Sequence, residues 1–373
     1  MKQNKYIKNI HLRSKEIVEQ QIEQQNVNKS QVQLQEFDYA AKPYVDFDFI
    51  KLKNIKSIKM SDSGSRGVIF IDSEQGAIVL KLSGQVGVEL FLNKLAQALD
   101  IKTTQMKCLK WCDVEMQELR NDILFAASTD EVLSHRLKQK LKVAYFEIIE
   151  YIPGLQLYCF QGERAKKIFN QERLFNLGKI IGFDIFIHNG DRFPLPIWRS
   201  VGNAYNIILK VIDEKQEDMF NIHNANLNFD CIYSIDPSTI LKQLDSSIQD
   251  KILNTYIEKV QKFLQELCDD VKKNESKCLE AFQDFIFEQT QYKLNDNELQ
   301  IVKKGILYQI QKISQFGIEN IIKIKQELIV PDFQDWMDSY NNCLNQIHIE
   351  FHEKLIKVFT EIINTNSELF QTL

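Results

Sequence analysis

The chain carries HNGDRFPLP at residues 188–196, GNAYNIILK at 202–210 and CIYSIDPS at 231–238. In these stretches Asp191 follows an apolar helical run, Asn206 opens a short β-branched strand, and Asp236 ends the next one. Enzymes that transfer phosphoryl groups use residues of these types, in this order, to place a base and two Mg²⁺ ligands. The order therefore predicts Asp191 as the base and Asn206 and Asp236 as metal ligands, since Mg²⁺ prefers oxygen donors.

Each of these residues taken alone also has a structural explanation. Asp191 and Arg192 can form a salt bridge within the loop, and Asp236 can cap a helix. The insert between Asp191 and Asn206 is long, so Asn203 competes with Asn206 as the ligand. It is the ordered set of three that favours a phosphotransferase over these local explanations.

A glycine-containing turn lies ahead of two predicted strands in the N-terminal half. The turn is part of SDSGSRGVIFI at residues 61–71, and the strand AIVLKL follows at 77–82. Backbone amides of such a turn can cover the phosphates of a nucleotide. The residues that we expect in this role are Gly64, Ser65 and Gly67.

The strands on either side of the next helix supply two more parts of a nucleotide site. Lys81 comes at the end of its strand, where its ammonium group is expected to contact phosphates. Glu89 lies at the start of the following helix and is expected either to orient Lys81 or to be a solvated first-turn residue. The apolar run FEIIEYIPG then predicts a connector whose backbone, from Glu150 to Ile152, meets an adenine.

The order of predicted elements indicates an α+β fold with two lobes like those of protein kinases. Short β-branched runs between residues 47 and 152 predict antiparallel strands, interrupted by one helix over 88–101. From residue 163 the pattern is helical to the end, apart from strands around IILKV and CIYSI. The expected domains are a polar Gln-rich tail (1–40), a β-rich nucleotide-binding lobe (41–155), and a mainly helical lobe (156–373) with its catalytic and metal-binding loops in 156–240 and further helices in 241–373.

Composition excludes several classes of protein. The net charge of −5 gives no electrostatic reason to expect a nucleic-acid partner. The seven cysteines are scattered and do not form a disulfide or zinc pattern, and no signal peptide or membrane span is found. We therefore expect a cytoplasmic protein, with the cytoskeleton as a candidate location.

Histidines give weaker signals. His188 lies beside the candidate base, and the expected role is structural, with a ring nitrogen bonding the turn. His348 and His352 are four residues apart on a predicted helix, which can present two metal ligands on one face. No third ligand follows, so we expect a solvated helix face there.

The motifs resemble those of a known family. SGSRGVIFID, AIVLKLS, FEIIEYIPG and IIGFDIFIHNGDRFPLPIWRSVGNAYNI are similar to the catalytic domain of the actin-fragmin kinases, atypical protein kinases related in fold to the phosphoinositide kinases. The similarity runs from about Phe47 to Ile240 and is most specific from His188 to Ile207. One departure follows Asp236, where the chain reads PSTILKQLDSS without the Phe-Gly or Ala-Pro-Glu signatures of ordinary protein kinases.

The resemblance implies a role for each matching residue. Lys81 would be the phosphate-binding lysine, Asp191 the catalytic aspartate, Asn206 a metal ligand, and Asp236 the metal-binding aspartate that opens the activation segment. It also implies ATP and Mg²⁺ as cofactors and a protein substrate with a Ser or Thr acceptor, of which actin is the founding example.

Three functions remain open on the sequence alone. The leading hypothesis is an atypical Ser/Thr protein kinase acting on a cytoskeletal or other protein. The second is a kinase-fold scaffold, active or inactive, built into a large assembly, because a fold does not by itself imply activity. The third, a lipid kinase, is disfavoured because Lys242 stands almost alone after Asp236, where an anionic head group should require a basic cluster.

Overall fold

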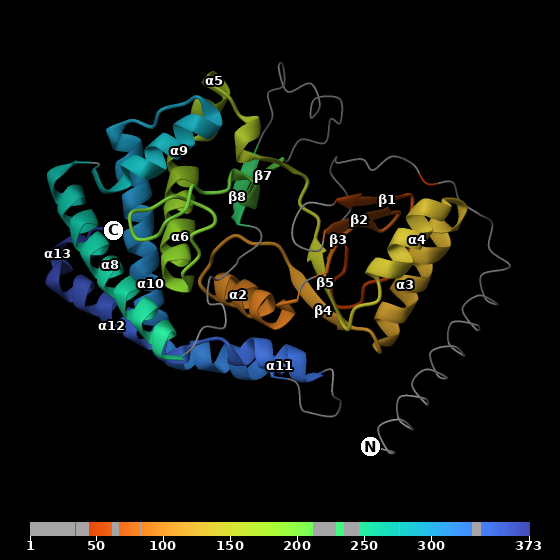
Figure 1. Cartoon of the computed structure of the whole chain (residues 1–373). Helices are drawn as coiled ribbons and strands as arrows, with labels where there is room; N and C mark the ends of the chain where they lie inside the picture. Colours follow the sequence, from red (N-terminus) through yellow and green to blue (C-terminus); the bar gives the residue numbers. More distant parts are fainter. Residues whose placement is uncertain are drawn as a thin grey trace. The chain divides into compact units, whose positions relative to one another are not determined.

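Figure 1 shows the computed structural model of the chain. It describes Leu34 and residues 45–61, 67–82, 84–211, 229–234, 246–275, 277–329 and 337–373. These residues fall into two compact units. The first unit holds Leu34, 45–61, 67–82 and 107–150, and the second holds 84–106 together with the described residues from 151 onward.

A five-stranded sheet with the order β1-β2-β3-β5-β4 organises the first unit. The pairs β1–β2, β2–β3 and β3–β5 are antiparallel. The strands β2, β3 and β5 are the β-branched runs from which strands were predicted, because such side chains pack well on a pleated surface. The bounds are β1 (Ser57–Ser61), β2 (Val68–Ser73), β3 (Gly76–Lys81), β4 (Met106–Lys110) and β5 (Tyr145–Glu150).

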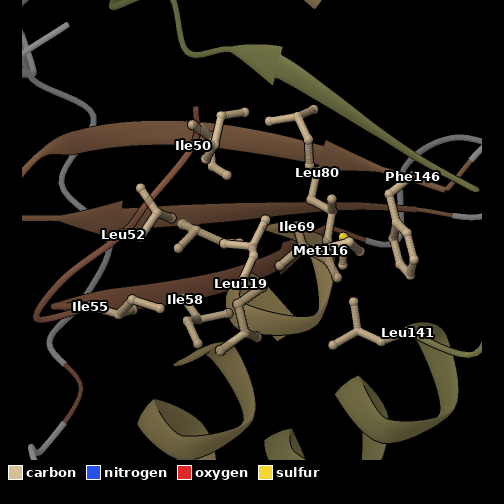
Figure 2. Packing of buried hydrophobic residues seen from close by; sticks show 14 of the residues in the cluster. Ile50, Leu52, Ile55, Ile58, Ile69, Leu80, Met116, Leu119, Leu141 and Phe146 are labelled. Atoms are coloured by element: carbon tan, nitrogen blue, oxygen red, sulfur yellow. The ribbon is translucent and has the colours of Figure 1, made fainter. Parts of the chain in front are cut away.

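Two helices cover one face of this sheet and close its core. They are α3 (Val114–Ala126) and α4 (Glu131–Lys140). Figure 2 shows Ile69 and Leu80 of the sheet pointing toward Met116 and Leu119 of α3, all of them buried. Sequence analysis predicted one helix between residues 47 and 152, and α3 and α4 are additional to it. Their buried stripes are narrow, with only Leu137 buried in α4, so the helical period is masked by charged residues.

The helix predicted over 88–101 is α2 (Val86–Ala98), and it belongs to the second unit. Ten of its thirteen residues are buried, which is why its apolar residues are not restricted to one stripe. A side chain at its start, such as Glu89, therefore lies in packed surroundings rather than in solvent.

The second unit contains a small antiparallel sheet with the order β6-β7-β8. Its strands are β6 (Gly154–Gln156), β7 (Ile207–Val211) and β8 (Phe229–Ser234). The rest of the unit is helical. The helices are α5 (Glu163–Ile168), α6 (Gln171–Ile187), α8 (Ser246–Lys273), α9 (Glu280–Thr290), α10 (Asp296–Leu328), α11 (Met337–Asn345), α12 (Ile349–Thr365) and α13 (Ser367–Phe370).

Glycines let α6 and α10 cross at close range. A Cβ atom on Gly178 of α6 would overlap the carbonyl oxygen of Val302, and one on Gly305 of α10 would overlap that of Phe175. Only residues without a side chain fit there, so the two backbones touch. The crossing holds α6, whose C-terminal end leads into the HNGDR loop, against the part of α10 that precedes its kink at Gly317, where φ is 74°.

The sequence-based fold class is confirmed. A five-stranded sheet comes first and a mainly helical region follows, as in a kinase-like fold. Within the part of the chain that the structure describes, no helix combines the length and apolar character needed to cross a bilayer. The polar tail expected over residues 1–40 lies outside the described residues, apart from Leu34.

Candidate functional site

Helix α6 ends at a sharp turn that starts the candidate catalytic loop. His188 adopts a left-handed conformation with φ of 57°, and the N–H of Asn189 donates to the carbonyl of Asp184 at 2.8 Å. The same carbonyl also accepts the N–H of His188, and this arrangement terminates the helix. The chain then turns out of the helix, and Asp191 follows three residues later at the surface.

A buried ion pair anchors the loop. The carboxylate of Asp184 accepts hydrogen bonds from the guanidinium of Arg192 and, at 3.0 Å, from the side-chain amide of Asn189. Asp184 is 1% exposed and Arg192 is fully buried. Burial raises the pKa of Asp184 to about 6, while the nearby Arg192 guanidinium opposes that rise. Arg192 thus holds the loop through the carboxylate of Asp184.

The long insert after Arg192 is packed into the second unit. Phe193 and Trp198 are buried, and the Trp198 indole N–H donates to the Phe193 carbonyl at 2.7 Å. The N–H of Asn203 donates to the carbonyl of Arg192 at 3.1 Å. The insert is therefore a closed loop that leaves and returns at the same point, which brings Asn206 back to Asp191.

Asp191 and Asn206 are in direct contact. The Asn206 side-chain amide donates to the Asp191 carboxylate at 2.7 Å. Asp191 is exposed, whereas Asn206, immediately before β7, is only 7% exposed. A carboxylate only accepts, so the amide nitrogen must face Asp191, and the amide oxygen is the atom that Asn206 could offer to a cation.

Asn203 has a different role in the same loop. Its side-chain oxygen accepts the N–H of Tyr205 at 3.1 Å and caps the short 3₁₀ turn Ala204–Asn206. The oxygen donors of Asp191 and Asn206 fit Mg²⁺ by their chemistry. The second expected metal ligand, Asp236, lies outside the described residues.

His188 packs as a neutral core histidine. Its ring lies 4.0 Å from the ring of Tyr256, centroid to centroid, and the Tyr256 hydroxyl donates to the Ile185 carbonyl at 2.7 Å. Burial lowers the pKa of His188 to about 4. The ring is therefore uncharged near neutral pH and packs against Tyr256. The expected hydrogen bond from the ring to the turn is not made by Nδ1, which is buried without a hydrogen-bond partner among the described residues.

Lys81 is the last residue of β3 in the first unit. The register of the β3–β5 pair sets it directly opposite Glu147, whose side chain is fully buried. Opposite residues of an antiparallel pair share a face, with Cβ atoms about 4.5–5.5 Å apart. Sequence analysis did not single out Glu147. The available signal was a carboxylate at the second position of the apolar run FEIIEYI.

The remaining predicted site residues are distributed between the two units. Gly67, just before β2, has φ of 80°, and a Cβ atom there would lie 2.6 Å from the Ser61 carbonyl oxygen, so this turn position requires glycine. Glu150 ends β5 in the first unit, whereas Glu89 and Ile152 are buried residues of the second. Gly64 and Ser65 lie outside the described residues.

His348 and His352 were expected on a solvated helix face, and the burial of His352 corrects that expectation. His352 is 3% exposed, its ring nitrogen lies 2.8 Å from the carbonyl oxygen of His348, and its ring contacts that of Phe186 edge-on at 4.9 Å. Burial lowers its pKa to about 4. The four-residue spacing reflects core packing inside the helical unit.

Comparison with known proteins identifies the family of the chain. The family model described as actin-fragmin kinase, catalytic, matches residues 29–310, which is more than half of the 373 residues. The match extends beyond both ends of the segment from about Phe47 to Ile240 whose motifs resemble this family. It includes α8, α9 and the first half of α10.

Two proteins of Dictyostelium discoideum, both provisionally named actin-fragmin kinases, are similar to this chain. The first is 28% identical over 200 residues, and the second is 27% identical over 164 residues. These alignments cover 51% and 42% of this chain, and 47% and 36% of the two relatives. The chain thus spans about half, or less, of the length of the curated relatives that it matches. By the extent of the family match, the chain belongs to the actin-fragmin kinase catalytic-domain family.

Proposed function

We propose that this chain transfers the γ-phosphoryl group of ATP to a Ser or Thr hydroxyl of a protein, with Mg²⁺ as the metal. Membership of a kinase family implies a phosphotransferase that uses ATP. The single observation that supports the finer proposal is the exposed carboxylate of Asp191, held at 2.7 Å by the amide of Asn206. A surface carboxylate with a fixed orientation is what an acceptor hydroxyl requires.

Asp191 is assigned the role of the base. Phosphoryl transfer depends on positioning and on stabilising charge, so the base must orient the hydroxyl and accept its proton. The Asp184–Arg192 pair fixes one end of the loop, and the hydrogen bond from Asn206 fixes the carboxylate itself. Asp191 therefore keeps its place without being buried, and it remains accessible to a protein substrate.

Asn206 and Asp236 are assigned to the metal. When bound, Mg²⁺ would neutralise charge on the transferred phosphoryl group. Asn206 donates through its nitrogen to Asp191 and so has its oxygen available for the ion. Asp236 would add the charge that binds the cation strongly. This assignment selects Asn206 over Asn203, because the Asn203 oxygen is used as a cap.

The nucleotide is assigned to the turn and strands of the first unit and the connector that follows. Lys81, at the end of β3, would contact phosphates, and Glu89 of α2 would orient it. Gly67 supplies the backbone geometry of a tight turn. The other residues in the proposed nucleotide site are Gly64, Ser65, Glu150 and Ile152.

A cytoskeletal protein is the proposed substrate class, and the cytoplasm is the proposed location. The support is the family description and the names of the two relatives, which mention actin-fragmin. Purified actin, alone and in complex with a severing protein, is the first substrate to test. Phosphate found on Ser or Thr would support the finer assignment, whereas phosphate found only on lipid would contradict it.

The decisive experiment compares Asp191→Asn with the matched variant Asp284→Asn, which changes an exposed carboxylate on α9. We expect Asp191→Asn to bind ATP with Mg²⁺ like the wild type and to lose at least about 100-fold in transfer rate, the usual scale of a lost base. Asp284→Asn should keep full activity. A wild-type chain that binds ATP without transfer would support a scaffold, and equal activity of both variants would remove Asp191 from the site.

A further inference from the structure

Helix α2, which carries Glu89, is fastened at its C-terminal end by the body of the second unit. The carbonyl of Leu99 accepts a hydrogen bond from the side chain of Gln309 at 3.3 Å. The carboxylate of Asp100 lies 3.3 Å from the ammonium groups of both Lys179 and Lys312. This end of α2 is thus tied to α6 and α10.

The N-terminal end of α2, where Glu89 lies, is covered by α11. A Cβ atom on Gly87 would lie 2.9 Å from the carbonyl oxygen of Tyr340 and 3.1 Å from the Leu344 side chain. The thiol of Cys343 donates to the carbonyl of Gly84 at 3.4 Å. Tyr340 and Leu344 are 5% and 0% exposed, so both residues are shielded from solvent where they meet α2.

The turn after α11 continues this cover. Gln346, Ile347 and His352 line a small cavity together with residues of α2, among them Val88 and Leu92. Ile347 and His352 are themselves buried. The first two turns of α2 therefore pack against a continuous surface formed by α11 and the beginning of α12.

Glu89 is within electrostatic reach of this surface. Burial raises the pKa of the Cys343 thiol, and the carboxylate of Glu89 raises it further. Cys343 is also the residue whose thiol contacts the carbonyl of Gly84, two residues before α2 begins. A shift of α11 would thus be felt at the backbone just before α2 and at the Glu89 carboxylate.

The covering segment lies outside the part of the chain that matches the family model. That match ends at residue 310, within α10, whereas α11 begins at Met337. The contacts on α2 consequently come from helices that the family match does not include. We propose that α11 is a positioning element for Glu89, so that the C-terminal helices of this chain set the catalytic state of the kinase.

This inference rests on the proposed function, because it matters only if Glu89 orients the phosphate-binding Lys81. Leu344 and Tyr340 would act through α2 and would not touch nucleotide or substrate. Anything that lifts α11 away from Gly87 would release the N-terminal end of α2 while its C-terminal end stays fastened to α6 and α10. Loss of catalysis without loss of fold is the expected signature.

The test uses the full chain and compares Leu344→Ala with Ile362→Ala. Both changes remove buried aliphatic carbon from the C-terminal helices, but Ile362 lies ten residues after His352 along α12, beyond the surface that covers α2. The rate at which an alkylating reagent labels Cys343, measured by mass spectrometry, reports the α11–α2 contact independently of activity. Phosphoryl transfer per folded molecule reports the consequence.

We expect Leu344→Ala to speed labelling of Cys343 several-fold and to lower kcat by at least about tenfold, with Ile362→Ala close to wild type in both. Equal transfer rates for the two variants would overturn the inference, even if both lose thermal stability. Unchanged labelling of Cys343 would also overturn it, since the contact would then not depend on Leu344. A wild-type chain without transfer would instead refute the proposed function, and the inference with it.

Gly87→Ala provides the same test from the α2 side, should Leu344→Ala fail to fold. The added methyl group meets the Tyr340 carbonyl and the Leu344 side chain, so α11 must move away. The expected result is faster labelling of Cys343 with a similar fall in kcat. Wild-type transfer by Gly87→Ala with fast labelling would show that α11 does not position Glu89.

Discussion

The amide of Asn206 donates to the carboxylate of Asp191 at 2.7 Å, across fifteen residues of sequence. The two residues meet because the insert between them closes on itself through the bond from the Asn203 N–H to the Arg192 carbonyl. One amide side chain is thus placed to orient the candidate base through nitrogen and to bind a cation through oxygen. The candidate base and the proposed metal site would thus be linked through Asn206, and substituting this residue tests the link.

Asn206→Ala should weaken the Mg²⁺-dependent part of ATP binding more than Asn203→Ala does. The first change removes both an oxygen ligand and the hydrogen bond to Asp191, whereas the second removes a cap of the short 3₁₀ turn. Titration of ATP at several Mg²⁺ concentrations measures the difference. If Asn203→Ala shows the greater rise in the Mg²⁺ requirement, the metal belongs to Asn203 and the assignment of Asn206 is wrong.

Asp184→Asn should destabilise the second unit by about 3–5 kcal/mol, because it leaves the guanidinium of Arg192 buried without its counter-charge. Urea unfolding followed by tryptophan fluorescence suits the measurement, since Trp198 lies in the same loop. Asp184→Asn/Arg192→Met should recover part of the loss, because no charge then remains buried. A single variant as stable as wild type would mean that the pair does not anchor the loop.

Much of the fold could be predicted from local patterns. The strands β2 and β3 and the helix α2 follow from β-branched runs and helical spacing, and each occurs where it was expected. The helices α3 and α4 were missed because their apolar stripes are narrow. The crossing of α6 and α10 could not be anticipated either. Gly178 and Gly305 are 127 positions apart, and a glycine within a helix does not indicate which other helix will pack against it.

The candidate site was predictable in its residue types but not in its contacts. The spacing of Asp191 and Asn206 indicated a base and a ligand, yet the hydrogen bond between them depends on the folded insert. A carboxylate inside the apolar run IIGFDIFI signals that Asp184 needs a partner, but only the structure identifies Arg192. Likewise, Glu147 becomes visible beside Lys81 only through strand register, which the sequence does not fix.

Gly305→Ala should destabilise the second unit by about 1–3 kcal/mol, the usual cost of overpacking. In an exposed helix the same change would stabilise by roughly 1 kcal/mol, so the expected sign is reversed. The reason is the overlap of the new methyl group with the Phe175 carbonyl of α6. Lys304→Ala, at the exposed neighbouring position, should stay within about 0.5 kcal/mol of wild type. Thermal unfolding of both variants decides whether the helices cross as closely as described.

The last prediction concerns acid. The pKa of His352 falls from its ordinary value of 6.5 to about 4 because the side chain is buried. As pH falls below 6.5, His352 therefore becomes protonated in the unfolded chain but stays neutral in the folded chain until the pH approaches 4. The stability that this group contributes is present above pH 6.5 and is lost as pH falls toward 4, by about 2 kcal/mol between pH 7 and pH 5.

His352→Gln cannot take up that proton, so it should lose correspondingly less stability over the same interval. Urea unfolding at both pH values gives the difference. Other titrating groups contribute equally to both proteins and cancel. A His352→Gln variant whose stability falls as steeply as that of wild type would show that the ring is protonated in the folded state, against the buried packing described for it.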